Sequence, residues 1–141
     1  MALAEAAAAT KDFERAANLY VKACNGRAAV GCTELGVLYN RGSGVTRDVA
    51  QAAVYYERGC TLGDMSGCNN LGTVYEFGSI GFPDPAGAAK LYERACSNAH
   101  VDGCANLLRT PGATPQEKAR ARDLLEKACA AGIARACSKI R

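Results

Sequence analysis

The sequence is poor in the residue types that build a large interlocking core or a histidine-based active site. Its 141 residues include no tryptophan, three phenylalanines and one histidine, His100. With so few bulky side chains, we expect alanine and glycine to pack helices at close backbone approach. A Ser-His-Asp triad could form only by assembly with another chain, because His100 lies in an expected turn. We therefore predict no catalytic residues in this chain.

Long apolar runs are also absent. No segment approaches the roughly 18 apolar residues of a transmembrane helix, so we expect no membrane insertion. The first ten residues, MALAEAAAAT, have no basic start and contain Glu5, unlike a secretory signal peptide. We interpret this segment as a helix tail after an added methionine. If the protein is exported, the chain is a mature or excised piece.

Charge of one sign is not concentrated on any segment. The formal net charge is +3, and the longest basic cluster, Lys118, Arg120 and Arg122, is interrupted by alanines. Such a short cluster favours a solvated helix face. No basic stripe alternates with aromatic residues, as binders of single-stranded nucleic acid require. We therefore expect no nucleic-acid partner.

Cysteine, by contrast, is abundant and regularly spaced. The eight cysteines form four pairs eight positions apart, and successive pairs are separated by 36, 36 and 33 positions. Aligning the chain on this step gives one repeat domain over residues 1–141. Its repeats span 12–47, 48–83 and 84–116, and a truncated fourth repeat spans 117–141. Alanine, tyrosine and leucine recur at matching positions, so the period extends well beyond cysteine.

Each repeat reads as two helices joined by a tight turn. The first helix places apolar residues at i, i+3, i+4 and i+7. Asp12, Asp48 and Asp84 precede these helices, where a short carboxylate can cap the backbone amides. We expect the second helix to start near the second cysteine. Its predicted core face in the first two repeats includes Leu35, Leu38, Tyr39, Leu71, Val74 and Tyr75, with Gly36 and Gly72 among them.

The turn also decides the cysteine pairing. Residues eight apart in one helix would lie about 12 Å apart, whereas disulfide α-carbons must lie within about 7 Å. A turn between the two cysteines brings them together. Because the spacing is the same in every repeat, we expect the same pairing in every repeat. We predict the pairs Cys24–Cys32, Cys60–Cys68, Cys96–Cys104 and Cys129–Cys137. Persistent disulfides indicate an oxidising compartment, either the periplasm or the exterior of the cell.

The same spacing argues against a metal or cofactor. Ligands in zinc motifs commonly stand two to four residues apart, and this chain has no such cysteine pair. A redox-active CxxC is also missing. His100, between Cys96 and Cys104, is expected to be a solvent-exposed turn residue. We expect neither a metal site nor a cofactor.

A single helix pair cannot bury its apolar face alone, so neighbouring repeats must stack. The expected fold is all-α: an α/α right-handed superhelical solenoid of four disulfide-stapled repeats with a concave surface. The third linker is three residues shorter and loses the YxxG end of its second helix. We expect a local irregularity in curvature there.

The run LGVLYNRGSGVTRDVAQAAVYYERGC, residues 35–60, resembles the consensus of Sel-one-like repeats, relatives of the tetratricopeptide repeats. The cysteine pairs resemble a subset of that family, the bacterial cysteine-rich secreted (Hcp-type) proteins. The resemblance covers roughly residues 12–141 and departs at LLRTPG in the third repeat and at Arg122 in the fourth. It implies an α/α solenoid with one disulfide per repeat. It also implies an extracytoplasmic protein-interaction scaffold, and some members bind or slowly hydrolyse β-lactams.

The leading functional hypothesis is a monomeric module that binds a peptide or protein in its concave groove, which first helices usually line. Positions that vary between repeats would set specificity, and recurrent Glu-Lys/Arg pairs could hold a peptide. The candidate groove residues are Asn18, Val21, Val54, Glu57, Arg58, Lys90, Glu93 and Arg94. For any one of these residues alone, solvated helix surface is the simpler interpretation. A toxin-neutralising immunity or inhibitor protein would use the same groove.

A β-lactamase or penicillin-binding activity is the enzymatic alternative. Serine acyl enzymes of that kind need an SxxK nucleophile and a KTG strand. No serine here has a lysine three residues on, and no KTG sequence is present. The sequence therefore favours a binding protein over an enzyme.

Overall fold

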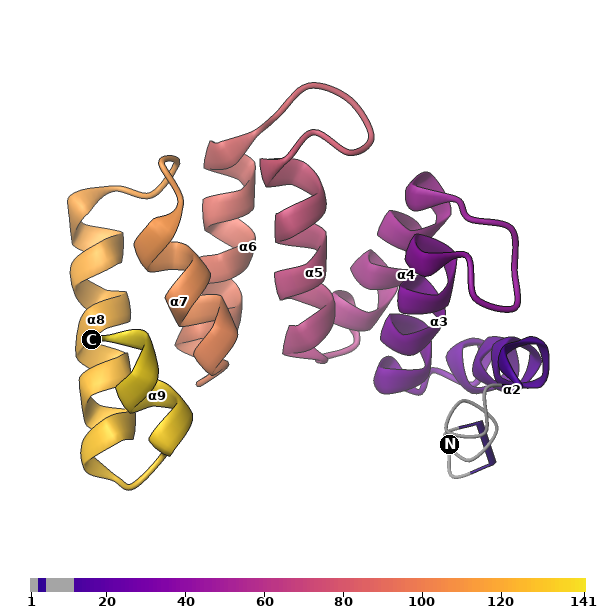
Figure 1. The fold of residues 1–141 in the computed structure, drawn as a ribbon, viewed down its shortest axis with the longest axis horizontal. Coiled ribbons are helices and arrows are strands. Elements are labelled where there is room, and N and C mark those ends of the chain that lie inside the picture. The colour runs from indigo at the N-terminus through magenta and orange to yellow at the C-terminus, as the bar shows by residue number, and fades with distance from the viewer. Residues whose placement is uncertain (1–2, 5–11) are drawn as a thin grey trace. The chain divides into compact units, whose positions relative to one another are not determined.

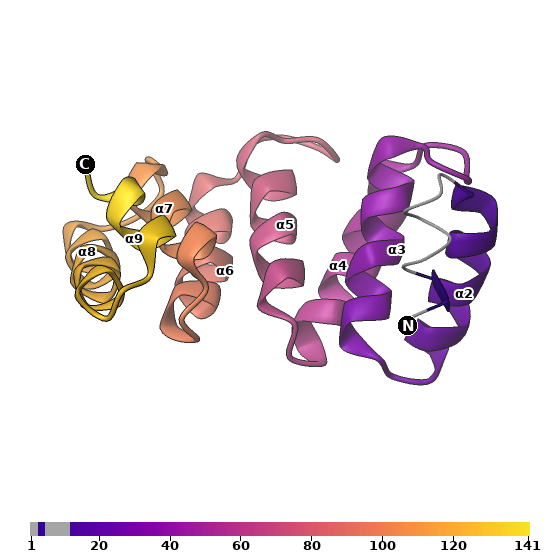
Figure 2. The same ribbon diagram turned by 60° about the horizontal axis from the view of Figure 1, so that its bottom comes forward.

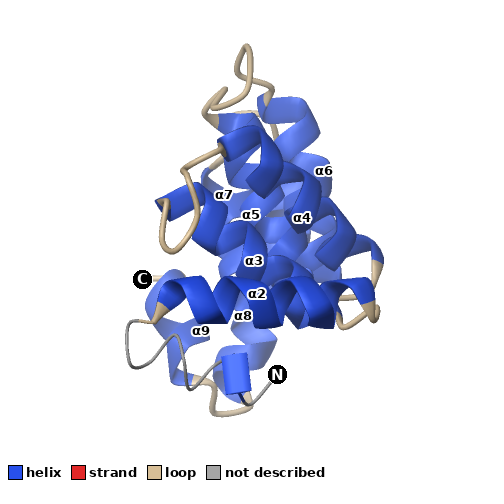
Figure 3. Ribbon diagram, turned by 90° about the vertical axis from the view of Figure 1, so that its right-hand side faces the viewer, coloured by secondary structure: helices blue, strands red, loops and turns tan. Residues whose placement is uncertain are grey.

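The computed structural model describes residues 3–4 and 12–141, and these residues form eight α-helices and no strand (Figures 1 and 3). The predicted all-α class is therefore confirmed. The expected helix tail at residues 1–10 lies outside the described residues, apart from Leu3 and Ala4. Contacts divide the chain into two compact units, residues 1–67 and 68–141, and each unit is considered by itself.

The first helices of the repeats begin at side-chain caps. They are α2 (Phe13–Asn25), α4 (Val49–Thr61), α6 (Pro85–Ser97) and α8 (Pro115–Ala130). The carboxylates of Asp12, Asp48 and Asp84 each accept a hydrogen bond from a backbone N–H in the first turn, as predicted. Thr114 and Glu117 form a reciprocal capping box, so α8 begins two residues before the repeat boundary expected at Glu117.

The second helices are α3 (Ala29–Arg41), α5 (Met65–Glu76), α7 (Val101–Arg109) and α9 (Ala134–Lys139). Each begins about one helical turn before the second cysteine of its repeat, rather than at the cysteine itself. Helix α7 has only 9 residues; it ends at Arg109, and Thr110 is its C-cap residue. This short helix matches the missing YxxG end that the sequence shows in the third repeat.

The disulfides close the turns between paired helices. Cys24–Cys32 and Cys96–Cys104 each have a Cα–Cα distance of 4.5 Å, and Cys129–Cys137 has one of 4.7 Å. The remaining two cysteines, Cys60 and Cys68, are also disulfide-bonded. The turn residue that sits three positions after the first cysteine has a positive φ in every repeat. These residues are Arg27, Gly63, Ala99 and Gly132.

The first unit packs α2 against α3 and α3 against α4. Small residues allow this packing, because Ala16 and Ala52 are both 0% exposed. The core cluster around α2 and α3 contains Ala16, Tyr20, Leu35 and Leu38, and the apolar residues Phe13 and Val45 cover its edge. The buried faces therefore follow the predicted apolar periodicity of both helices.

The second unit is a two-layer array of helices. Contacts join α6 to α7, α7 to α8 and α8 to α9, and they also join α6 to α8 and α7 to α9 (Figures 1 and 2). First helices therefore lie beside first helices, and second helices beside second helices. Tyr92, Leu107 and Leu125 are among the large side chains buried in its core.

Candidate functional site

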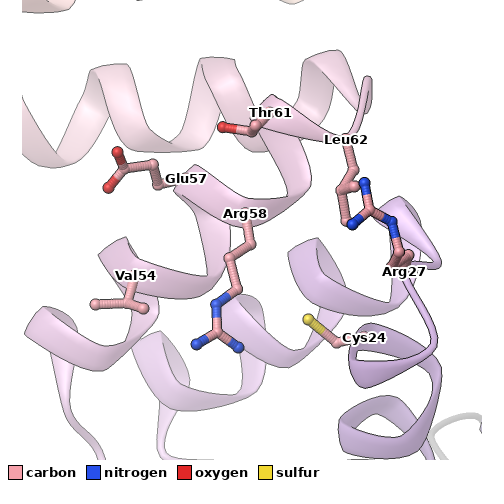
Figure 4. A pocket seen from close by; sticks show the side chains of 7 residues that line it. All are labelled: Cys24, Arg27, Val54, Glu57, Arg58, Thr61 and Leu62. Carbon is pink, nitrogen blue, oxygen red and sulfur yellow. The ribbon is translucent and has the colours of Figure 1, made fainter.

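A pocket of about 480 Å³ lies in the first unit between the end of α2 and the outer face of α4 (Figure 4). We call it the first-helix pocket, because both helices are first helices of their repeats. Three of the predicted groove residues, Val54, Glu57 and Arg58, contribute to its wall. The complete lining consists of Cys24, Arg27, Val54, Glu57, Arg58, Thr61 and Leu62.

Helical periodicity explains why α4 presents these side chains together. Val54, Glu57 and Arg58 are related as i, i+3 and i+4, so they share one face of the helix. The other face contains Ala52 and Tyr56, which are buried. Helix α4 thus separates its structural side from the side that lines the pocket.

An aromatic pair supports the guanidinium group of Arg58. The Cζ atom of Arg58 lies 5.3 Å from the centre of the Tyr55 ring, within the range of a cation–π interaction. Tyr55 in turn stacks on Tyr39 of α3, with ring centres 5.6 Å apart and an interplanar angle of 15°. These contacts restrict the Arg58 side chain and orient a positive charge beside the pocket.

A second arginine reaches the pocket from the turn after α2. Arg27 has a φ of 67°, a left-handed conformation that non-glycine residues adopt at an energetic cost. Figure 4 shows its side chain beside Leu62, while Val54 and Glu57 lie toward the other end of the pocket. Arg27 and Leu62 were not among the predicted residues. The sequence signal was the arginine itself, at a turn position where two other repeats have glycine.

The lining suits one kind of ligand group. Val54 is 43% exposed and offers apolar surface together with Leu62. Two arginines against one glutamate give the lining a positive balance, which favours a carboxylate near the pocket. The chemistry therefore matches an apolar side chain next to an acidic group, as in a peptide.

The other predicted groove residues lie elsewhere. Val21 is half-buried and packs against the core cluster of the first unit, so it belongs to the core more than to a groove. Glu93 is half-buried and forms an ion pair with Arg120 of α8. Asn18 on α2 is exposed, as are Lys90 and Arg94 on α6. None of these five residues lines the first-helix pocket.

Second helices form a further concavity in the second unit, with a volume of about 510 Å³. Its wall is mostly polar. Asn106 of α7 donates a hydrogen bond to the side-chain oxygen of Asn69 on α5 at 2.8 Å and accepts one from Arg109. Asp102 pairs with Arg135 at 2.7 Å and lies 3.9 Å from Lys139. The charged side chains of this wall, Asp102, Arg109 and Lys139, thus already have polar partners within the protein.

His100 has a structural role. Its Nδ1 atom accepts a hydrogen bond of 3.0 Å from the backbone N–H of Gly103, which caps α7. The residue is half-buried, so the expected solvent-exposed turn position is not what the structure shows. Within the described residues, no three His, Cys, Asp or Glu side chains gather as a metal site would require. Nor does any helix in residues 12–141 have the length and apolar character to cross a membrane.

Comparison with known families gives a match over most of the chain. The family model described as "Sel1 repeat" matches residues 4–26, 29–64, 66–100 and 105–133. The last three of these segments pair the second helix of one repeat with the first helix of the next, a different division of the same periodic array. A comparison with curated protein sequences found no match.

Solved structures with the same fold come from several bacteria. Helicobacter pylori cysteine rich protein B is 32% identical, with a TM-score of 0.65, over 90% of this chain and 93% of that one. A Sel1 repeat protein from Oxalobacter formigenes is 28% identical, with a TM-score of 0.70, over 82% of this chain and 50% of that one. A protective antigen of uropathogenic Escherichia coli, which displays an SLR fold, is 23% identical with a TM-score of 0.74. The match covers 90% of this chain but only 28% of that antigen.

Proposed function

Because this chain belongs to the Sel1 repeat family, we propose that it is an extracytoplasmic scaffold that binds a peptide or protein segment in its first-helix pocket. Sel1 repeat proteins generally act as protein-interaction scaffolds rather than as enzymes. The observation that carries the proposal is the lining of the pocket, which combines exposed apolar surface with two arginines.

The disulfides support a location outside the cytoplasm. All eight cysteines are disulfide-bonded, and cytosolic thiols are normally kept reduced. The periplasm or the exterior of the cell provides the oxidising conditions under which such a chain keeps its bonds.

The ligand in this proposal is an extended segment with one large apolar residue beside an Asp or Glu. The apolar residue would cover Val54 at one end of the pocket or Leu62 at the other, and the carboxylate would face Arg58 or Arg27. An arginine already oriented by an aromatic ring loses less side-chain freedom on binding. Since the pocket is open to solvent, its ionic contribution should weaken as salt rises.

Selection from a random peptide library on the immobilised protein tests the ligand class. We expect the selected sequences to be enriched in Phe, Leu or Ile next to Asp or Glu. The affinity of a selected peptide is then measured for Val54→Asp and Arg58→Ala. Each should weaken binding by about tenfold or more, as the loss of an anchor contact does.

Matched controls come from the next repeat, where Lys90 and Arg94 occupy the positions of Val54 and Arg58. Lys90→Asp and Arg94→Ala should leave the affinity within about twofold, because neither residue lines the pocket. Equal losses in both repeats, or a selection without the expected enrichment, would reject the pocket as the binding site. Hydrolysis of a chromogenic β-lactam above the rate of buffer would contradict the proposal that this protein only binds.

A further inference from the structure

The loop between α5 and α6 presents three large apolar side chains to solvent. Phe77 is 70% exposed, Ile80 is 46% exposed and Phe82 is 96% exposed. The segment from residue 77 to residue 83, FGSIGFP, contains no charged residue. Single exposed apolar residues are ordinary on protein surfaces, whereas several large ones within one loop are a common feature of interaction sites.

The corresponding loops of the neighbouring repeats provide an internal comparison. In each of these loops a glycine lies in close contact with the backbone of the first turn of the first helix in the same repeat. A Cβ atom on Gly44 would lie 2.3 Å from the carbonyl carbon of Phe13, and one on Gly112 would lie 2.0 Å from the oxygen of Pro85. The residue after each glycine, Val45 or Ala113, packs against a core cluster.

The loop at 77–83 lacks both of these features. The two loops are aligned on the left-handed glycine that follows the second helix, Gly42 in the first repeat and Gly78 in the second. In this alignment Ile80 corresponds to Gly44, and Gly81 corresponds to Val45. A side chain at the first position is incompatible with the close backbone approach that Gly44 makes. At the second position, no heavy atom lies within 4 Å of a Cβ built on Gly81. This loop is therefore presented outward, with its apolar residues uncovered.

We propose that this loop is a ligand for the first-helix pocket of a second copy of the chain. The loop offers Phe82 as an apolar anchor. It is flanked by the acidic residues Glu76 and Asp84, each of which also accepts a hydrogen bond within the protein. The pocket offers Val54 and Leu62 as apolar surface, together with the side chains of Arg27 and Arg58. The two surfaces are thus complementary in both polarity and charge. This inference rests on the proposed function of the pocket.

Each copy carries one loop and one pocket, so the contact is heterologous. A pair formed in this way leaves one loop and one pocket free, and further copies can add. The contact area is that of a single loop, well below the roughly 1,200 Å² of a standard stable interface. We therefore expect a weak, concentration-dependent association. In this proposal the protein is a monomer when dilute, and the sequence-based expectation of a monomer stays a prediction.

Sedimentation velocity of the whole protein tests the association between about 10 µM and 1 mM, the range expected for a small interface. The wild type should show a weight-average sedimentation coefficient that rises with concentration. Phe82→Ser and Val54→Asp should each remove this rise. The control Ile133→Ser changes another exposed apolar residue, 47% exposed, outside both surfaces and should leave the rise unchanged. A wild-type rise in Phe82→Ser would overturn the inference.

Complementation gives the sharper test. Phe82→Ser keeps an intact pocket, and Val54→Asp keeps an intact loop. A mixture of the two variants should therefore form 1:1 pairs and no larger species, although neither variant associates alone. A mixture that stays monomeric where the wild type associates rejects the loop-to-pocket contact, and so do larger assemblies.

A capped synthetic peptide, EFGSIGFPD, separates failure of this inference from failure of the proposed function. The peptide should bind the wild type more strongly than a scrambled control and should lose that binding with Val54→Asp. If library peptides bind in the pocket and this peptide does not, the inference is wrong and the proposed function stands. If neither binds, both are wrong.

Flotation with phosphatidylcholine and phosphatidylglycerol vesicles examines the other class of partner that an apolar loop could meet. We expect no flotation, because the acidic flanks of the loop oppose an anionic surface. Flotation that Phe82→Ser abolishes, in a protein that does not self-associate, would instead make the loop a membrane anchor and overturn the proposal.

Discussion

The ring of Tyr92 lies directly against the backbone of Gly72. A Cβ atom on residue 72 would stand 2.6 Å from Cε1 of Tyr92, closer than real side-chain contacts. The same relationship joins Gly36 and Tyr56, where the distance to Cδ1 is also 2.6 Å. In both pairs the glycine belongs to a second helix and the tyrosine to the next first helix, so the predicted close helix approach at these glycines is confirmed.

At the contact between the third and fourth repeats, both the tyrosine and the glycine are replaced. The fourth repeat has Leu125 in place of the tyrosine, and the third repeat has Leu108 in place of the glycine. Leu125 is buried in the core cluster of the second unit, and Leu108 packs against that cluster. A large residue against glycine has thus been exchanged for two residues of medium size. Interfaces between helices are filled by complementary volumes rather than by one fixed residue type.

Substitution of these glycines by alanine tests the packing, because the sign of the change in the free energy of unfolding distinguishes overpacking from helix propensity. Gly72→Ala and Gly36→Ala should each lower the free energy of unfolding by about 1–3 kcal/mol, because the added methyl group overpacks the tyrosine contact. Helix propensity alone predicts the opposite, a gain of about 1 kcal/mol in a helix interior. Urea denaturation of the oxidised protein measures the change. Gly81→Ala is the control, since its Cβ meets no atom within 4 Å, and a stabilised Gly72→Ala variant would contradict the packing.

Two of the buried tyrosines make the fold sensitive to high pH. Burial raises the pKa of Tyr56 to about 12, and burial together with the hydrogen bond that its hydroxyl donates to Glu76 raises that of Tyr92. A raised pKa in the folded state stabilises the protein fully below the unfolded pKa of about 10. That stabilisation is lost as the pH rises through the folded value. Stability should therefore fall between about pH 10 and pH 12.

Rapid pH jumps measure this effect before the disulfides react. Tyrosinate absorbance reports ionisation without interference, because the chain has no tryptophan. We expect part of the tyrosine signal to appear only as the protein unfolds. Tyr56→Phe should reduce the dependence of the free energy of unfolding on pH in this range. Complete and immediate ionisation of all tyrosines in the folded protein would show that burial does not protect them.

Local signals in the sequence were sufficient to predict much of the fold. The caps at Asp12, Asp48 and Asp84 depend only on residues within one turn of the helix. The pairing of Cys24 with Cys32 follows from a short turn between two helices. Each of these features is decided within a few residues, so the repeat pattern predicts it. The start of α8 at Pro115 was missed because Thr114 supplies the cap three residues before the aligned position.

The candidate site depends on contacts that the repeat pattern does not contain. Val21 and Val54 were both predicted for the groove, yet Val21 packs on a core cluster that includes Ala4, a residue outside the aligned repeats. Arg27 and Leu62 enter the first-helix pocket from turns rather than from the predicted helix face. Residues that meet through packing between helices and turns cannot be paired by periodicity alone.

The turn between paired helices is strained in two repeats. Ala99 has a φ of 64° at the position where Gly63 has a φ of 104°. Ala99→Gly should raise the free energy of unfolding by up to about 1 kcal/mol, since glycine adopts this conformation without the steric cost. Gly63→Ala should lower it by about 1–2 kcal/mol through the backbone alone, because its Cβ has no neighbour within 4 Å. Urea midpoints of the two variants should therefore move in opposite directions, and a shared direction would contradict this reading of the turn.

The last disulfide should be the first to open under mild reduction. Cys129 and Cys137 are half-buried, whereas Cys24 is 5% exposed and Cys96 is 2% exposed. Helix α9, which carries Cys137, has only 6 residues and packs on the end of the second unit. A short and largely exposed helix opens locally at a lower free-energy cost than the core, and each opening exposes the sulfur atoms to thiolate attack. Access should therefore decide the order of reduction.

Limited reduction followed by alkylation and peptide mass spectrometry measures that order. We expect Cys129 and Cys137 to be labelled about tenfold faster than Cys24 and Cys32, a ratio equivalent to about 1.4 kcal/mol in opening free energy. The variant Cys129→Ser/Cys137→Ser should keep the far-ultraviolet signal of the preceding helices, because their own disulfides remain closed. Equal labelling of both pairs would mean that the end of the chain is as firmly closed as its core. Loss of all helical signal in the double variant would mean that the last repeat is required for folding of the whole chain.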